Sequence, residues 1–119
     1  MVTLAIIARV GAHKAFLKEG LIELQCYQKT TPFGQSVPIH VFDYRGISFA
    51  LISRHGENTY SVSAPFVNDK ANLWALKDEG VEKIISWTAP GAINEAFLPG
   101  DLVIPNDILD ETRFGPYTF

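Results

Sequence analysis

The chain has 119 residues, of which 47% are hydrophobic, and its formal net charge at pH 7 is −3. This length and apolar content suit one folded α/β domain and argue against a disordered chain. The acidic balance, with no run of lysine or arginine, excludes the electrostatic footprint of a nucleic-acid-binding protein, and no apolar stretch is long enough to span a membrane.

The first part of the chain is expected to form two strands around a short helix. Residues 3–7 (TLAII) are apolar without alternation, which predicts a strand that is buried on both faces. Residues 12–20 (AHKAFLKEG) predict a short helix that ends at Gly20. Residues 21–29 (LIELQCYQK) alternate apolar and polar side chains, so we expect a half-buried strand there.

A turn and a hairpin follow. Pro32 and Gly34 in the stretch TTPFGQS mark a turn or loop. Two β-rich runs, residues 38–44 (PIHVFDY) and residues 47–53 (ISFALIS), flank an Arg-Gly dipeptide. This arrangement predicts a β-hairpin with a tight turn.

The periodicity then becomes helical. Apolar residues recur at helical spacing in residues 67–79, and we interpret Trp74 in this stripe as packing against the sheet. Asn68 or Ser63 is expected to cap the start of the helix, and Gly80 stands where a left-handed stop is expected.

The remaining elements complete the predicted fold class. Residues 81–87 (VEKIISW) predict a strand, and residues 98–105 (LPGDLVIP) predict a turn at Pro99-Gly100 followed by another short strand. The order of elements predicts an α/β fold with a mixed twisted sheet and covering helices. The chain ends in apolar and aromatic residues, and we expect further sequence or a partner chain to cover them.

Cysteine and histidine usage limits other possibilities. Cys26 is the only cysteine, so no internal disulfide can form and a reducing, cytoplasmic location is expected. The three histidines, His13, His40 and His55, are far apart in the sequence and match no common metal-ligand spacing. We therefore predict no metal site and interpret His40 as a strand-face residue.

Arg54 and His55 stand at the end of a predicted strand, with Gly56 directly after them. A guanidinium offers forked donors to an oxyanion, histidine adds a further donor, and glycine lets the backbone approach a ligand closely. An anion site is one interpretation of this pattern. A solvated strand end with a surface ion pair is the other.

The motif RHG, the long stretch VNDKANLWALKDEGVEKIIS, the motif LPGDLVIPND and the upstream TTPFGQS together resemble the methylthioadenosine phosphorylase branch of the purine nucleoside phosphorylases. The resemblance covers most of residues 30–118. It implies part of the nucleoside phosphorylase fold and the reaction of phosphorolysis, in which phosphate attacks the anomeric carbon of the ribose and the purine leaves. Because family members are considerably longer, residues 1–119 are expected to form one phosphorylase-like domain that corresponds to an N-terminal half.

The resemblance also implies a phosphate site and no cofactor, with phosphate as the co-substrate. Arg54 and His55 fall on the family's phosphate-contacting pair, and Thr88 and Ala89 fall on a threonine-alanine step whose hydroxyl and backbone N–H also reach phosphate. Both pairs follow predicted strands, where ligands of open α/β sheets gather. A plain strand-to-loop turn is the alternative for Thr88-Ala89, and no catalytic residue is assigned.

The chain departs from the family pattern after its first strand. Ala8 and Arg9 stand where the family has paired glycines, and Val10 stands where a hydroxyl residue binds phosphate. The loop after RHG lacks the family's histidine, and the residues that contact the base and the ribose belong to the half beyond this chain.

Two functions remain open. The first is a nucleoside phosphorylase of methylthioadenosine or another purine nucleoside, whose site needs a second half or a partner. The second is a non-catalytic, phosphorylase-like binding or assembly subunit. Because family members form trimers, a homo- or hetero-oligomer is expected in either case.

Overall fold

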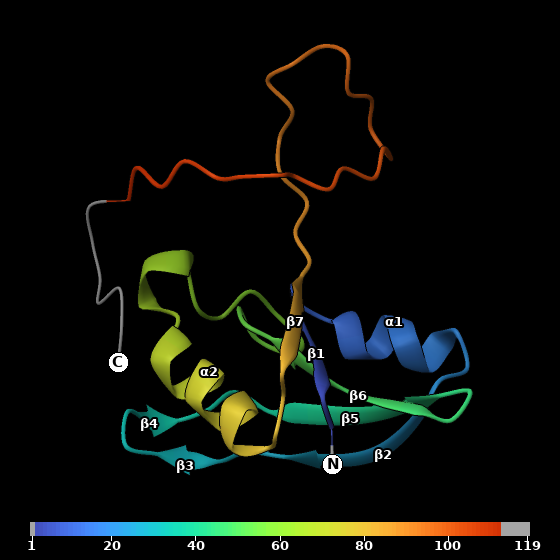
Figure 1. Cartoon of the computed structure of the whole chain (residues 1–119), viewed down its shortest axis with the longest axis vertical. Coiled ribbons are helices and arrows are strands. Elements are labelled where there is room, and N and C mark those ends of the chain that lie inside the picture. Colours follow the sequence, from blue (N-terminus) through green and yellow to red (C-terminus); the bar gives the residue numbers. More distant parts are fainter. Residues whose placement is uncertain (1, 113–119) are drawn as a thin grey trace.

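The computed structural model describes residues 2–112 of the chain (Figure 1). In order, its elements are β1 (Leu4–Ala8), α1 (Ala12–Lys18), β2 (Ile22–Tyr27), β3 (Thr30–Thr31), β4 (Gly34–Gln35), β5 (Ile39–Tyr44), β6 (Ile47–Ser53), the short 3₁₀ helix η1 (Ala64–Phe66), α2 (Asp69–Asp78) and β7 (Lys83–Ser86). The apolar C-terminal residues 113–119, which we expect to be covered, lie outside the described part.

Five strands form one mixed sheet in the order β2-β5-β6-β1-β7, and β3 and β4 pair separately. The strand β1 runs parallel to β6 on one side and to β7 on the other, whereas β2, β5 and β6 are antiparallel neighbours. The predicted α/β class with a mixed sheet is confirmed. The carboxyl ends of β6, β1 and β7 consequently meet at one edge of the sheet.

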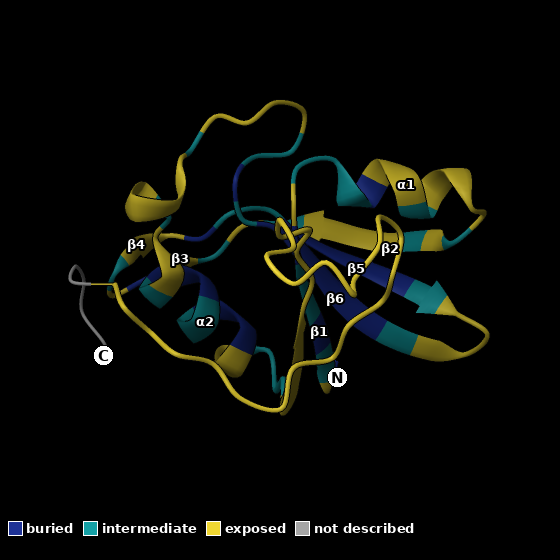
Figure 2. Ribbon diagram, turned by 90° about the horizontal axis from the view of Figure 1, so that it is seen from above, coloured by how far each residue is buried: buried dark blue, intermediate teal, exposed yellow. Residues whose placement is uncertain are grey.

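The two α-helices cover opposite faces of the sheet (Figure 2). On one face, Ala12 and Phe16 of α1 pack against a buried cluster that includes Phe42 and Leu51. The cluster on the other face contains Val2, Ala5, Ile39, Val41, Ala50, Ile52, Ala75 and Leu76, the last two from α2. Because β1 contributes to both clusters, it is covered on both faces, as its unbroken apolar run predicts.

The hairpin of β5 and β6 is the predicted one. Its strands pair from Ile39 with Ile52 to Tyr44 with Ile47, which leaves a two-residue turn at Arg45 and Gly46. Both turn residues have positive φ, at 54° and 83°, as a type I′ turn requires.

The helix α2 begins where the sequence predicts, because the Asn68 side chain accepts a hydrogen bond from the Ala71 backbone N–H at 3.2 Å. Ser63, the other candidate, makes no capping hydrogen bond through its side chain. After the helix, Gly80 has a φ of 91°, which is the expected left-handed stop. The interpretation of Trp74 as a core residue is wrong, since Trp74 is only half-buried.

The position of Trp74 follows from the face that α2 presents to the sheet. Its buried residues are Ala71, Asn72, Ala75 and Leu76. Trp74 is not on this face, so its side chain lies at the flank of the helix and stays partly exposed.

The strand β2 forms as predicted, but its expected half-buried apolar face is wrong. Ile22 and Leu24 are 63% and 53% exposed. The pairing register with β5 shifts between Glu23 and Gln25, so one extra residue interrupts the alternation. Because β2 is also the edge strand, the helices do not cover its apolar side chains.

The strand expected in residues 98–105 is also wrong. The turn at Pro99-Gly100 is present, since Asp101 N–H donates to the Leu98 carbonyl at 3.0 Å and the Asp101 carboxylate accepts from Leu98 N–H at 2.8 Å. Residues 87–112 nevertheless extend away from the sheet without regular structure and are exposed (Figure 1). A strand needs a neighbour to satisfy its backbone groups, and this segment has none within the described residues. Among residues 2–112, none of the helices is long and apolar enough to cross a membrane.

Candidate phosphate site

The segments that carry the predicted phosphate residues leave the sheet on either side of β1. The backbone N–H of Arg54 donates to the Ala8 carbonyl at 3.2 Å, and the backbone N–H of Trp87 donates to the Ile7 carbonyl at 2.8 Å. The chain therefore remains bound to β1 for one residue beyond β6 and beyond β7. Because β6 and β7 flank β1, the backbones at Arg54 and Thr88 are two strand spacings apart, which is about 9–10 Å.

The side chains of Arg54 and His55 form one hydrogen-bonded unit. Arg54 Nε donates to His55 Nε2 at 3.0 Å, so Nε2 is an acceptor and the ring proton is on Nδ1, which donates to the Val62 carbonyl at 2.9 Å. His55 is 5% exposed and its ring stacks on Tyr60 with centroids 4.6 Å apart. In this arrangement both nitrogens of His55 are engaged, and the donors left for an anion belong to Arg54.

The loop after this pair is closed onto the His55 backbone. The His55 carbonyl accepts hydrogen bonds from Ser61 N–H at 2.9 Å and from Val62 N–H at 3.1 Å. Gly56 has a φ of 122°, and a Cβ there would lie 2.4 Å from the Thr59 carbonyl oxygen. Glycine is therefore the residue that this turn requires, and it holds Arg54 and His55 at the sheet edge.

Asp69 is a neighbour of this pair that sequence reasoning missed. It occupies the first turn of α2. Desolvation raises the pKa of Asp69, and the nearby Arg54 guanidinium is the main influence that opposes this rise. A carboxylate beside this pair competes with a bound anion for the guanidinium. Its place in the first turn of a predicted helix was the available signal, but only the packing of α2 shows which residues it approaches.

The other predicted phosphate residues are less enclosed. Thr88 and Ala89 are both exposed, on the segment that leaves β7. Ala8, the last residue of β1, is buried, and Arg9, which follows it, is exposed. The structure thus brings Arg54 and His55 together, places Thr88-Ala89 beyond β1 on the same edge, and adds Arg9 as a second cationic residue at that edge.

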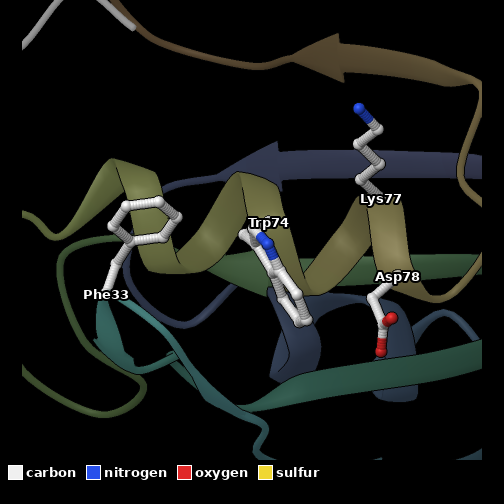
Figure 3. A pocket seen from close by; sticks show the side chains of 4 residues that line it. All are labelled: Phe33, Trp74, Lys77 and Asp78. Atoms are coloured by element: carbon white, nitrogen blue, oxygen red, sulfur yellow. The ribbon is translucent and has the colours of Figure 1, made fainter. Parts of the chain in front are cut away.

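An open depression of about 520 Å³ lies beside α2 and is lined by Phe33, Trp74, Lys77 and Asp78 (Figure 3). None of the predicted phosphate residues lines it. Asp78 forms an ion pair with Lys29, and Phe33 and Trp74 give the depression an aromatic wall.

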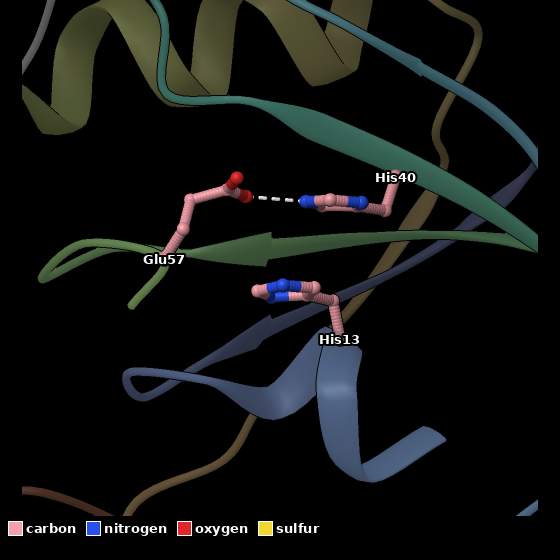
Figure 4. Close-up of side chains that lie close together, drawn as sticks. All are labelled: His13, His40 and Glu57. Atoms are coloured by element: carbon pink, nitrogen blue, oxygen red, sulfur yellow. Dashed lines mark hydrogen bonds and ion pairs between the residues drawn. The ribbon is translucent and has the colours of Figure 1, made fainter. Parts of the chain in front are cut away.

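A separate group of titratable side chains lies on the α1 face of the sheet. His13, His40 and Glu57 come together there from α1, β5 and the loop after β6 (Figure 4). Sequence reasoning missed this group because its members are separated by 27 and 17 residues, and no linear motif relates them.

The mixed sheet with a helix on each face is an α/β fold of the nucleoside phosphorylase type. The sequence profile of the Phosphorylase superfamily matches residues 3–119, and the chain belongs to that superfamily. Within it, the S-methyl-5'-thioadenosine phosphorylase of Neurospora crassa is 37% identical over 99% of this chain, and that of Pyrococcus horikoshii is 35% identical over 100%. The expected resemblance to methylthioadenosine and purine nucleoside phosphorylases is confirmed.

Solved structures agree with this assignment. A double mutant of the adenosine/methylthioadenosine phosphorylase from Schistosoma mansoni, in complex with adenine, has a TM-score of 0.73 and 31% identity. The alignment covers 85% of this chain and 34% of that protein. This chain likewise spans 37% of the Neurospora relative and 44% of the Pyrococcus relative.

Proposed function

We propose that this chain supplies the phosphate-binding part of a purine nucleoside phosphorylase, with methylthioadenosine as the favoured nucleoside class. Arg54, His55, Thr88 and Ala89 would hold phosphate, which is the co-substrate, and no cofactor takes part. The observation that carries the proposal is the departure of both pairs from one sheet edge, on either side of β1. Arg54 anchors the anion through the guanidinium N–H groups that His55 leaves free.

A second half or a partner chain would complete the site. The strand β7 is an edge strand whose Ile84 and Ile85 are both exposed. The following segment exposes further large apolar side chains, namely Trp87, Ile93, Phe97, Leu98, Leu102, Val103, Ile104, Ile108 and Leu109. Apolar surface of this extent is typical of a region that packs against another polypeptide, which supports an oligomer. The single cysteine supports a cytoplasmic location.

Phosphate binding tests the anion site directly. Isothermal titration with inorganic phosphate is expected to show saturable binding that Arg54→Ala abolishes. Arg45→Lys, which changes an arginine in the β5–β6 turn, serves as the control and is expected to leave binding unchanged. Phosphate binding that is absent, or equal in Arg54→Ala, contradicts the proposal.

A second candidate function is a non-catalytic, phosphorylase-like assembly subunit. It is favoured by Val10, which offers no hydroxyl at the turn after β1 where the family binds phosphate. Release of the base from methylthioadenosine or inosine in the presence of phosphate separates the two functions. Turnover that Arg54→Ala abolishes contradicts the assembly function, and the native mass of the protein from its source reveals a companion chain.

A further inference from the structure

Five metal-ligand side chains gather on the α1 face of the sheet. The donor atoms of His13, His40 and Glu57, which Figure 4 draws, all lie within 4.8 Å of one another. The same holds for the donor atoms of Glu23, Cys26 and His40. His40 belongs to both groups and is 4% exposed. Imidazole and carboxylate together form a donor set that suits divalent transition metals.

His40 has the hydrogen bonds of a metal-binding histidine. Its Nδ1 is paired with the Glu23 carboxylate, and its Nε2 is paired with the Glu57 carboxylate. A histidine that binds a metal usually donates its other ring N–H to a carboxylate, which fixes the tautomer and the ring orientation. Glu23 is in the position to do this, so that Nε2 of His40 is the nitrogen directed to Glu57.

His13 supplies a nitrogen that the fold leaves unused. The residue is nine-tenths buried, and its Nδ1 has no hydrogen-bond partner among the described residues. A buried ring nitrogen without a partner costs free energy that a ligand would recover. The His13 ring stacks on the His40 ring with centroids 4.6 Å apart, so the ring that carries this nitrogen lies beside the ring that Glu57 contacts.

The charges of the cluster favour a divalent cation. Two glutamate side chains, Glu23 and Glu57, face the two ring nitrogens of His40. A divalent ion between such oxygen ligands offsets negative charge that is costly to bury.

We propose that His13, His40 and Glu57 form a binding site for a divalent transition-metal ion, with zinc as the best match and Glu23 as the residue that orients His40. The ion would bind Nδ1 of His13, Nε2 of His40 and a carboxylate oxygen of Glu57, and the Nε2 proton of His40 would pass to solvent. Water completes a tetrahedral set.

The site closes by a small adjustment. Tetrahedral zinc with ligand bonds of about 2.0–2.1 Å places its donor atoms ~3.3 Å apart, so the most distant donor atoms approach one another by ~1.5 Å. The His13 and His40 rings are nearly parallel, at 7°, and parallel stacked rings cannot both direct a lone pair at one ion. The His13 ring therefore turns about χ2, which is a soft torsion in histidine.

A metal in this position would connect three segments of the fold. His13 lies on α1, His40 lies on β5, and Glu57 lies two residues after His55 in the loop that Gly56 closes. The ion would therefore restrain the loop that carries Arg54 and His55. The site shares no residue with the proposed phosphate site, so the two can be tested separately.

The experiment is a titration of metal-free protein with Zn²⁺ in competition with a chromophoric chelator, followed by Co²⁺ absorption to report coordination geometry. We expect one ion per chain and the release of one proton, measured in a weakly buffered solution. Glu57→Gln and His13→Gln are each expected to weaken binding by at least about tenfold, and Glu23→Gln by about 10–100-fold. Glu95→Gln, an exposed carboxylate on the segment after β7, is the matched control and is expected to leave affinity unchanged.

Glu57 lies at the surface side of the cluster, so Glu57→Gln keeps the test decisive if His13→Gln fails to fold. Stoichiometric binding that Glu57→Gln weakens and Glu95→Gln leaves unchanged supports the site. The absence of saturable Zn²⁺ binding overturns the proposal. An affinity that either Glu57→Gln or folded His13→Gln leaves unchanged overturns this ligand set.

Discussion

Arg54 and His55 are joined side chain to side chain, with Nε of Arg54 donating to Nε2 of His55 at 3.0 Å. This bond orients the guanidinium and leaves its two terminal NH₂ groups available to an oxyanion. The position of the unit is set by the backbone hydrogen bond from Arg54 N–H to the Ala8 carbonyl of β1. The candidate phosphate site is thus built on the central strand of the sheet.

The first prediction concerns the geometry of Arg54. Arg54→Lys keeps the positive charge but loses the planar fork and the bond to His55, so we expect phosphate affinity to fall by about tenfold, equivalent to ~1.4 kcal/mol. Isothermal titration with phosphate measures the change, and Arg45→Lys is the control. An affinity equal to that of the unchanged protein would show that charge alone holds the anion.

The second prediction concerns the turn at Gly56. Gly56→Ala introduces a Cβ that would lie 2.4 Å from the Thr59 carbonyl and 2.5 Å from Ser61 Oγ, at a φ of 122°. We expect it to lower the free energy of unfolding by about 2–4 kcal/mol. Gly91→Ala is the matched control, because nothing lies within 4 Å of its Cβ position. Urea denaturation measures both, and equal stabilities would refute the strained turn.

The third prediction separates the two histidines of the metal cluster in chelator-treated protein. Burial lowers the pKa of His40, but its hydrogen bonds to Glu57 and Glu23 outweigh burial and raise the pKa above the usual 6.5. Burial and His40 lower the pKa of His13. Histidine ring signals followed by NMR should therefore titrate above pH 6.5 for His40 and below it for His13. The reverse order would contradict the assignment.

The fourth prediction follows from the same shift. Because the folded pKa of His40 is raised, its stabilising contribution is fully present below the unfolded pKa of about 6.5 and is lost as the pH rises through the folded value. Glu57→Gln should consequently cost about 1–2 kcal/mol of unfolding free energy near pH 6 and less near pH 9. Urea denaturation at both pH values measures this difference, with Glu95→Gln as the control. A cost that is the same at both values would exclude a charged His40–Glu57 pair.

The fifth prediction concerns the start of α2. Asn68 caps the helix and its side-chain amide also donates to the Phe33 carbonyl at 2.8 Å. Asn68→Ala should therefore lower the free energy of unfolding by about 1–2 kcal/mol. Ser63→Ala removes a side chain that makes no capping bond and should change stability by less than about 0.5 kcal/mol. Thermal or urea unfolding that ranks the two variants in the opposite order would exclude this cap.

Local patterns in the sequence determined most of the elements of this protein. Three features depend only on neighbouring residues in the chain: the apolar run of β1, the Arg-Gly turn between β5 and β6, and the helix stop at Gly80. A few consecutive residues are therefore enough to predict each of them. The motifs around Arg54 and the α2 stretch also indicated the family. The burial of single side chains could not be predicted from the sequence, as Leu24 and Trp74 illustrate. A bulge in β2 and the face that α2 turns to the sheet decide which side chains are covered.

Only the tertiary structure decided which distant residues meet. The parallel pairing of β1 with β6 and β7 places Arg54 and Thr88 on one edge, and the packing of α1 on the sheet brings His13 to His40 and Glu57. The first meeting was expected from the family resemblance and from the places of both residues after predicted strands, but it depends on the parallel pairing. The second has no sequence signal, because metal ligands act through space and their separation along the chain is free. The missing strand in residues 98–105 has the same cause, since a β-rich sequence becomes a strand only where another strand accepts its backbone hydrogen bonds.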